Sequence, residues 1–282
     1  MDHPHEQSAS SLLKDHNLRP DKSLGQNFLT DPALLEKIVR IAGVTPADTV
    51  LEIGAGLGNL TAHLANHARS VTAVEFDRRF MPILSKQLSP YPNVKLVEGD
   101  ILQLKLSDLV QDDGYLVVAN IPYYITSRII RKLLEETIKP REIILTIQYE
   151  VAQRICTDSG KLNLLALSVL MYGKPSLETR IPAGAFYPPP KVDSAVIKID
   201  LYPEPRLPAE SREIFFQLAK AGFLHKRKTL RNSLSKGLGW PPKRASTLLN
   251  SVGIDPGRRA ETLSLEEWIH LTSAYDKISL EN

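Results

Sequence analysis

Short hydrophobic runs alternate with stretches of helical period over the middle of the chain. Each run has four to six residues and is rich in β-branched side chains. The runs cover residues 49–53, 70–75, 94–97, 115–119 and 143–147. Strands that alternate with helices usually form a parallel sheet joined by crossover helices. The pattern therefore predicts an α/β domain of the Rossmann-like type.

The last third of the chain has a different pattern. Two more strand-like runs, 176–181 and 194–201, are expected to pair as a hairpin at the sheet edge, joined by a stiff proline-rich loop. Helical segments then follow near 210–222, 227–236, 241–251 and 264–277. We expect these helices to end at Gly237, Gly239, Pro241, Gly253 and Pro256. The sequence thus predicts a flexible N-terminal segment over 1–22, an α/β domain over 23–202 and a smaller all-helical domain over 203–282.

The composition narrows the class of protein. The chain has 282 residues, 43% of them hydrophobic and 24% charged, and it holds one cysteine. One cysteine cannot form an internal disulfide, and no set of Cys and His has zinc spacing, so we expect no disulfide scaffold and no metal. The N-terminus lacks an apolar signal region, and no stretch approaches the ~18 apolar residues of a membrane span. We therefore expect a cytoplasmic protein without membrane contact, monomeric by default.

The positive charge is concentrated in the predicted helical domain. The formal net charge is +3, but residues 201–282 hold 13 Lys and Arg against 9 Asp and Glu. Four of these cations form a cluster, namely Lys226, Arg227, Lys228 and Arg231. The cluster is either a solvated helix face or a surface that binds the phosphates of a nucleic acid.

A glycine-rich turn follows the first predicted strand, in Val50-Leu51-Glu52-Ile53-Gly54-Ala55-Gly56-Leu57-Gly58. Glycines let a ligand approach bare backbone at the carboxyl end of a strand, which is the binding edge of an open α/β sheet. A triphosphate-binding loop would need lysine after the last glycine, and the dinucleotide fingerprint needs a small residue where Asn59 stands. The turn therefore favours a ligand without pyrophosphate.

Two acidic residues define that ligand further. Glu75 closes the second predicted strand, about 20 residues past the first glycine, where a carboxylate accepts both ribose hydroxyls. Asp100 follows the third strand, where a carboxylate can accept an adenine amino group, although an Asp after a strand also commonly caps a helix. An adenosine with a free 2′,3′-diol is implied, and S-adenosylmethionine meets that description.

The segment Asn120-Ile121-Pro122-Tyr123-Tyr124 directly follows the fourth predicted strand. An adenine amine is a poor nucleophile because its lone pair is conjugated with the ring. The Asn120 side-chain oxygen and the Pro122 carbonyl can each accept one N–H and turn the lone pair toward a methyl donor. Tyr123 offers a flat face for an unstacked base. The segment therefore predicts methylation of an adenine amine.

These segments resemble the ribosomal RNA adenine N6,N6-dimethyltransferase family, specifically its small-subunit dimethyladenosine transferase branch. The resemblance covers about residues 22–275. The matching segments are 24–29, 52–58, 99–100, 120–123, 186–194, 226–234, 253–256 and 259–261. The resemblance implies transfer of two methyl groups to N6 of each of two adjacent adenosines in a hairpin near the 3′ end of 16S ribosomal RNA. It also implies action on the pre-30S particle, late in small-subunit assembly.

The resemblance also implies roles for individual residues. The cofactor-binding set carried over by motif is Asn27, Leu29, Gly54, Gly56, Glu75, Asp100 and Asn120. Phe186 is implied to form a second stacking wall opposite Tyr123, and the basic cluster is implied to hold RNA. One departure concerns this site: Arg128 stands where many relatives have proline, which places a cation near the target pocket.

Other functions share part of this pattern. A 23S ribosomal RNA methyltransferase of the macrolide-resistance type has the same cofactor and Asn-x-Pro-Tyr segments, but residues 186–194 and the long C-terminal domain favour the small-subunit branch. A DNA adenine methyltransferase fits less well, because its chemistry loop usually has consecutive prolines where Ile121-Pro122 stands. An assembly factor that acts mainly by binding pre-30S particles is a third possibility.

Overall fold

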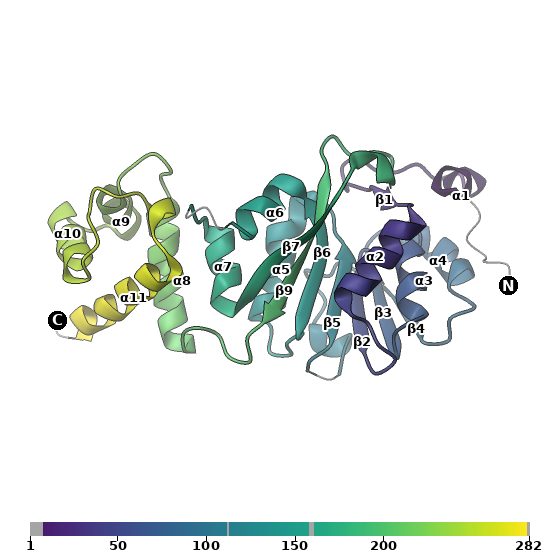
Figure 1. The fold of residues 1–282 in the computed structure, drawn as a ribbon, viewed down its shortest axis with the longest axis horizontal. Coiled ribbons are helices and arrows are strands. Elements are labelled where there is room, and N and C mark those ends of the chain that lie inside the picture. The colour runs from purple at the N-terminus through teal and green to yellow at the C-terminus, as the bar shows by residue number, and fades with distance from the viewer. Residues whose placement is uncertain (1–7, 112, 158–160, 281–282) are drawn as a thin grey trace. The chain divides into compact units, whose positions relative to one another are not determined.

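The computed structural model describes residues 8–111, 113–157 and 161–280 (Figure 1). The chain forms two compact units, one made of Met1–Ala152 with Pro175–Leu201 and the other of Gln153–Lys174 with Tyr202–Asn282. Residues 153–174, which the sequence assigned to the α/β domain, thus cluster with the C-terminal helices. None of the described helices combines the length and the apolar composition that a membrane span requires.

The first unit is built on a seven-stranded sheet with the order β4-β3-β2-β5-β6-β9-β7. Strands β4, β3, β2, β5 and β6 run parallel to one another, and β9 runs antiparallel to β6. Their bounds are β2 Thr49–Ile53, β3 Ser70–Glu75, β4 Val94–Glu98, β5 Leu116–Asn120, β6 Glu142–Gln148, β7 Gly173–Ile181 and β9 Ser194–Leu201. This sheet confirms the predicted α/β fold.

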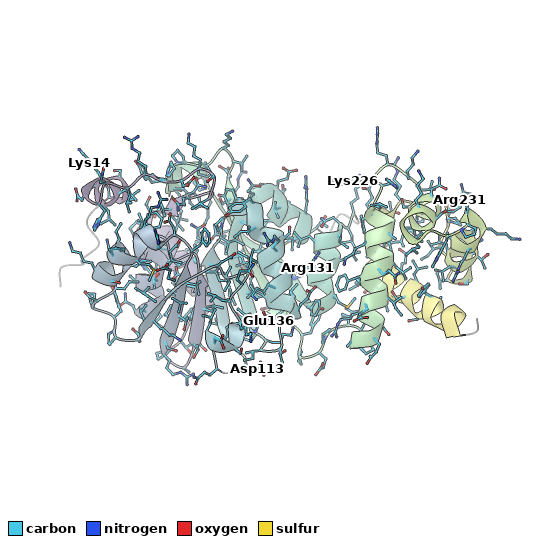
Figure 2. All side chains as sticks on the ribbon, turned by 180° about the vertical axis from the view of Figure 1, so that it is seen from behind. Lys14, Asp113, Arg131, Glu136, Lys226 and Arg231 are labelled. Atoms are coloured by element: carbon cyan, nitrogen blue, oxygen red, sulfur yellow. The ribbon has the colours of Figure 1, made fainter. Side chains whose placement is uncertain are left out.

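Helices cover both faces of this sheet. One face packs with α2, α3 and α4 into a continuous hydrophobic core, whereas α5 lies on the opposite face, as the two views show (Figures 1 and 2). The helices are α2 Pro32–Ala42, α3 Asn59–Ala65, α4 Met81–Gln87, α5 Thr126–Glu135 and α6 Tyr149–Ile155. Central strand residues such as Val117 and Val118 are fully buried because both faces are covered.

The N-terminal region differs from the flexible segment that the sequence predicts over 1–22. Residues 1–7 lie outside the described residues, but α1 (Ala9–Asp15) is a helix whose Leu12 and Leu13 are buried in the core. Ser8 caps it by accepting a hydrogen bond from the Ser11 amide at 3.2 Å. The segment was expected to be flexible because its overall composition is polar. Its two leucines nevertheless pack α1 against the core.

A second, two-stranded sheet joins distant parts of the first unit. β1 (Phe28–Leu29) runs antiparallel to β8 (Phe186–Tyr187), with Leu29 opposite Phe186. The Thr30 amide also donates to the Ala185 carbonyl at 3.1 Å. The two segments that the family resemblance singled out at opposite ends of this unit therefore lie side by side.

The second unit is helical, and its helices are α7 Leu164–Tyr172, α8 Ala209–Phe223, α9 Leu230–Leu238, α10 Pro242–Ser251 and α11 Leu265–Leu280. Its core is centred on Trp268, which is fully buried and stacks on Phe223 at 5.9 Å. Gly237 lies inside α9 instead of ending it. A Cβ there would come within 2.6 Å of the Ala221 Cβ, so the close packing of α9 on α8 requires glycine at this position. Gly239 ends the helix instead, with a φ of 67°.

Candidate active site

The carboxyl ends of four parallel strands meet at one edge of the sheet. β2 leads to Gly54, β3 ends at Glu75, β4 leads to Asp100 and β5 ends at Asn120. The order of strands along the chain reverses between β2 and β5, which are neighbours in the sheet. An open α/β sheet binds its ligand at such a switch point, because the loops diverge there and leave a crevice.

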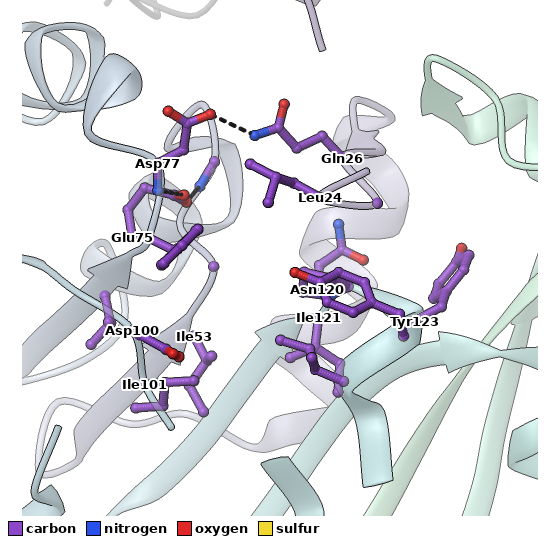
Figure 3. Close-up of a pocket in the computed structure, with 18 of the residues that line it drawn as sticks. Leu24, Gln26, Ile53, Glu75, Asp77, Asp100, Ile101, Asn120, Ile121 and Tyr123 are labelled. Carbon is purple, nitrogen blue, oxygen red and sulfur yellow. Dashed lines mark hydrogen bonds between the residues drawn. The ribbon is translucent and has the colours of Figure 1, made fainter. Parts of the chain in front are cut away.

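An open cavity of about 1030 Å³, a volume that includes the solvent at its mouth, occupies this position. In Figure 3, Glu75, Asp100 and Ile101 form one wall, while Asn120 and Tyr123 face them from the other. The cavity is also lined by residues from the segment before β1 and from the glycine turn, among them Leu24, Gln26, Asn27, Gly54 and Gly56. Residues 24–128 therefore supply one continuous site within the first unit.

The three glycines of the glycine turn adopt a left-handed backbone conformation. Gly54, Gly56 and Gly58 have φ values of 80°, 57° and 84°, a region that other residues rarely adopt. A Cβ on Gly56 would also come within 3.0 Å of the Phe28 ring. The Gly56 amide donates to Glu75 Oε2 at 2.7 Å, so the turn is tied to the end of β3.

Glu75 is a buried carboxyl at the centre of one wall. Its Oε1 accepts a hydrogen bond from the Asp77 amide at 2.8 Å, in addition to the bond from Gly56. Burial raises the pKa of Glu75, and the two backbone donors oppose this shift. Each carboxylate oxygen has more than one acceptor site, so Glu75 can still accept from ligand hydroxyls.

Asp77 and Gln26 close the site above Glu75, and sequence reasoning gave neither a role. Gln26 Nε2 donates to Asp77 Oδ2 at 2.8 Å (Figure 3). Arg79 also donates to both oxygens of Asp77, and this hydrogen-bonded guanidinium is the main cause that lowers the pKa of Asp77. Gln26 and Asp77 are 51 residues apart in the chain, so no local spacing could indicate their contact.

Glu52, within the glycine segment, is a second buried carboxyl that the sequence did not single out. Its side chain is 1% exposed, and its Oε2 has no hydrogen-bond partner within the described residues. Burial, with the nearby Glu75 adding to it, raises the pKa of Glu52 to about 8. Glu52 lines a small pocket beside the main cavity. Its raised pKa favours the protonated carboxyl at neutral pH.

Asp100 lines the cavity and also caps the turn after β4. Its Oδ1 accepts a hydrogen bond from the Leu102 amide at 2.9 Å. The capping role and the ligand role that the sequence suggested are thus compatible, since the second carboxylate oxygen remains. Phe76, which is 58% exposed, and Ile101 line the same cavity and provide apolar surface.

Asn120 is oriented by the segment before β1. Its Nδ2 donates to the backbone carbonyl of Asn27 at 3.1 Å, and Asn27 Nδ2 donates in turn to the Gly25 carbonyl at 3.0 Å. The bond to Asn27 orients the amide, and the Oδ1 of Asn120 has no hydrogen-bond partner among the described residues, so it is available as an acceptor. Both asparagines line the cavity.

Pro122 and Tyr123 continue the wall that contains Asn120. The Pro122 carbonyl accepts a long hydrogen bond of 3.3 Å from the Ile125 amide and keeps a second lone pair. The Tyr123 hydroxyl pairs with Ser194 Oγ at 2.6 Å, and burial raises the pKa of Tyr123. Ser194, the fully buried first residue of β9, thus fixes the far end of the ring.

Two of the residues expected to bind the cofactor or the target adenine do not line the main cavity. Leu29 and Phe186 are opposite each other in the β1–β8 pair, and both are buried. Leu29 lines the small pocket beside the glycine turn, and its carbonyl accepts a hydrogen bond from Asn59 Nδ2 at 3.1 Å. The stacking role expected of Phe186 therefore stays a prediction.

The basic cluster belongs to the second unit (Figure 2). Lys226, Arg227 and Lys228 lie in the turn between α8 and α9, not on the helix predicted over 227–236, and Arg231 is in the first turn of α9. All four are exposed, and within the described residues none has an acidic partner. The only side-chain hydrogen bond that any of them makes there joins Arg231 to Asn232.

His63 and His67, one turn apart on α3, are near an acidic residue that the local sequence did not reveal. Glu36 of α2 lies 3.4 Å from His63 Nδ1 and 3.9 Å from His67 Nε2. Nevertheless, no group of three or more His, Cys, Asp or Glu among the residues that the structure describes is arranged to hold a metal ion.

Comparisons with known proteins identify relatives of the whole chain. The model of the family described as ribosomal RNA adenine dimethylase matches residues 17–277. The ribosomal RNA small subunit methyltransferase A of Dehalococcoides mccartyi (strain CBDB1) is 45% identical over 268 residues, 95% of this chain and 92% of that protein. The protein of the same name from Pelotomaculum thermopropionicum is 40% identical over 94% of each chain.

Solved structures show the same fold. A dimethyladenosine transferase from Plasmodium falciparum aligns with 89% of this chain and 98% of its own, with a TM-score of 0.77 and 26% identity. The 23S rRNA methyltransferase ErmE aligns with 89% of this chain and 100% of its own, with a TM-score of 0.71 and 29% identity.

Proposed function

The chain belongs to the ribosomal RNA adenine dimethylase family and is a ribosomal RNA adenine dimethyltransferase; we propose that it acts on the small-subunit RNA with S-adenosylmethionine as donor. The proposed substrate is a pair of adjacent adenosines in a hairpin near the 3′ end of 16S RNA, each dimethylated at N6 in a late pre-30S particle. For this substrate we propose the cytoplasm as the place of reaction. The observation that carries the proposal is the single cavity that places Glu75 and Asp100 opposite Asn120.

The residues around the cavity fit S-adenosylmethionine. The Glu75 carboxylate can accept the two ribose hydroxyls, and Asp100 can accept the adenine amino group. A Cβ on Gly54 would lie 3.5 Å from the Asn120 carbonyl, so a side chain there would fill the space between the turn and β5. Asn27, Leu29 and Gly56 complete the proposed cofactor-binding set.

The chemistry that this chain supplies is orientation of the attacking amine. S-adenosylmethionine, when bound, provides an electrophilic methyl group. The Oδ1 of Asn120 accepts one N–H of the adenine amine and the Pro122 carbonyl accepts the other, which turns the nitrogen lone pair out of conjugation. The amine becomes acidic once it is alkylated, so its proton can leave to solvent without a strong base. After the first methylation only one N–H remains, so a single acceptor orients the second reaction.

Tyr123 and the basic cluster hold the RNA in this proposal. The Tyr123 ring, fixed by Ser194, stacks on the extruded adenine and excludes water from it. Phe186 is the proposed second wall. Lys226, Arg227, Lys228 and Arg231 contact phosphates, which accounts for their exposure without acidic partners in the described part of the chain.

The test is methyl transfer to purified ribosomal subunits. Small and large subunits from cells that lack this activity are incubated with the protein and methyl-labelled S-adenosylmethionine, and modified positions are mapped by reverse-transcription stops. We expect label in the small subunit, with stops at two adjacent adenosines near the 3′ end of its RNA. Label in the large subunit would favour a 23S enzyme of the ErmE type. Rescue of an assembly defect by an inactive variant would indicate an additional binding role.

A further inference from the structure

Arg128 stands at the boundary between the main cavity and the outer surface of α5. It lines the cavity together with Asn120 and Tyr123. It also lines an adjoining open depression over α5, and Leu102 is the other residue that the two hollows share. A group that leaves the cavity toward α5 therefore passes this guanidinium.

The charge of Arg128 is not neutralised by the neighbouring side chains. Arg128 is exposed and has no ion pair or hydrogen bond within the residues that the structure describes. The next cations along the helix differ, since Arg131 lies 3.9 Å from Glu135 and Lys132 lies 2.6 Å from Glu136. Arg128 has no such partner at i+4, because that position is Lys132 itself.

The start of α5 adds to this positive potential. Ile125 stands at the N-cap without a side-chain hydrogen bond to the first turn, and that turn has no acidic residue. Ser127, next to Arg128, is exposed and lines the outer depression. The Thr126 amide already donates to the Tyr123 carbonyl, but no side chain caps the next amides of this ten-residue helix. This helix end and an arginine on the third residue without a partner in the described part of the chain together favour an anion at this point.

Tyr124 provides a flat apolar surface one helical turn before Arg128. Its side chain is 60% exposed although it lines the cavity. The ring is supported by Gly25, where a Cβ would lie 3.5 Å from Tyr124 Cδ1. A supported aromatic face beside a free cation is the combination that holds a nucleotide by its base and its phosphate.

We propose that Arg128 and Tyr124 bind the nucleotide adjacent to the target adenosine, with the guanidinium on a flanking phosphate and the ring against the neighbouring base. This inference rests on the proposed function, because it requires an adenosine of an RNA strand inside the cavity. It makes the two residues RNA-positioning residues of this chain and assigns them no part in methyl transfer itself.

The experiment compares Arg128→Gln with Arg131→Gln, a matched loss of one exposed cation from the same helix. With unmethylated small subunits, Arg128→Gln should raise KM about tenfold or more and change kcat by less than about threefold. It should also reduce the slope of log affinity against log salt by the amount expected for the loss of about one phosphate contact. Arg128→Lys should recover part of the loss, and Tyr124→Ala should raise KM without changing the salt slope. Affinity for S-adenosylmethionine should stay unchanged in all of these variants.

A short oligoribonucleotide with one adenosine can identify the flanking phosphate that Arg128 contacts. A neutral methylphosphonate on one flanking phosphate should weaken binding to the wild type but have no effect on Arg128→Gln. Equal KM and salt slopes for Arg128→Gln and Arg131→Gln would overturn the inference and leave the proposed function intact. Weaker S-adenosylmethionine binding by Arg128→Gln would overturn it in favour of a cofactor contact. A wild type that transfers no methyl group to the subunits would instead overturn both proposals.

Discussion

Asn120 Nδ2 donates a hydrogen bond to the backbone carbonyl of Asn27, 93 residues earlier in the chain, at 3.1 Å. This bond engages the donor side of the amide and leaves Oδ1 as the acceptor. The segment before β1 thus sets the orientation of the residue that the proposed chemistry needs, although it contributes no strand to the main sheet. In the proposed chemistry, Asn120 acts through this acceptor oxygen.

Asn120→Ala should therefore lose methyl transfer while keeping the fold. We expect kcat with small subunits to fall at least about a hundredfold, the usual cost of removing one well-placed hydrogen-bonding group from a reaction centre. Asn120→Asp should be similarly inactive, because a carboxylate cannot donate to the Asn27 carbonyl. Label incorporation gives the rates, and thermal unfolding of each variant is the control. Substantial activity in Asn120→Ala would contradict the proposed chemistry.

The hydrogen bond between Tyr123 and Ser194 leads to a second prediction. Tyr123→Phe and Ser194→Ala should each reduce kcat/KM by about two- to tenfold, the value of one hydrogen bond that fixes the ring. The double variant should be no worse than the single ones if the bond is the common cause. Tyr123→Ala should lose about tenfold more, because the stacking surface itself is gone. Fully additive losses from the first two changes would show that the bond has no such role.

Much of this architecture follows from local sequence patterns. The runs at 49–53 and 70–75 are β2 and β3, with the bounds that the sequence predicts. Short β-branched runs of this length between turn residues are typical of buried strands. The strand ends then determine where Gly54, Glu75 and Asn120 meet, since parallel strands end at the same edge. This part of the site could therefore be predicted without knowing how the side chains pack.

Contacts between distant segments could not be predicted in the same way. The β1–β8 pair has only two residues in each strand, too short for a periodic signal. The burial of Glu52 depends on the packing around β2, and the place of Gly237 inside α9 depends on its contact with Ala221. Each of these features is set by a tertiary neighbour and not by residues adjacent in sequence.

The basic cluster makes a prediction about salt. Replacing Lys226, Arg227 and Lys228 by Gln should weaken binding to small subunits and reduce the slope of log affinity against log salt by about 2. Methyl transfer at saturating subunit concentration should change little, since the cluster belongs to the second unit and the cavity to the first. A triple control variant at Lys220, Lys236 and Lys243, which are exposed in the same unit, removes the same number of charges. An unchanged slope in the triple variant would make the cluster an ordinary solvated surface.

Glu52 gives a prediction about stability and pH. Its pKa is raised from 4.5 to about 8 in the folded protein, so between these values the folded state holds a proton that the unfolded state has released. The free energy of unfolding should then fall as pH rises through this window, by up to about 1.4 kcal/mol per pH unit from this group. The raised pKa of Glu75 acts in the same direction.

Glu52→Gln keeps the shape of the protonated acid and removes its titration. Its unfolding free energy, measured by urea denaturation from pH 5 to 8, should fall less steeply with pH than that of the wild type, so the two curves diverge toward pH 8. Glu98→Gln, which removes an exposed carboxyl at the end of β4, controls for the loss of one negative charge. Parallel curves for Glu52→Gln and the wild type would mean that Glu52 is already ionised in the folded protein near pH 5. In that case the carboxylate would need a cationic or hydrogen-bonding partner beside the glycine turn.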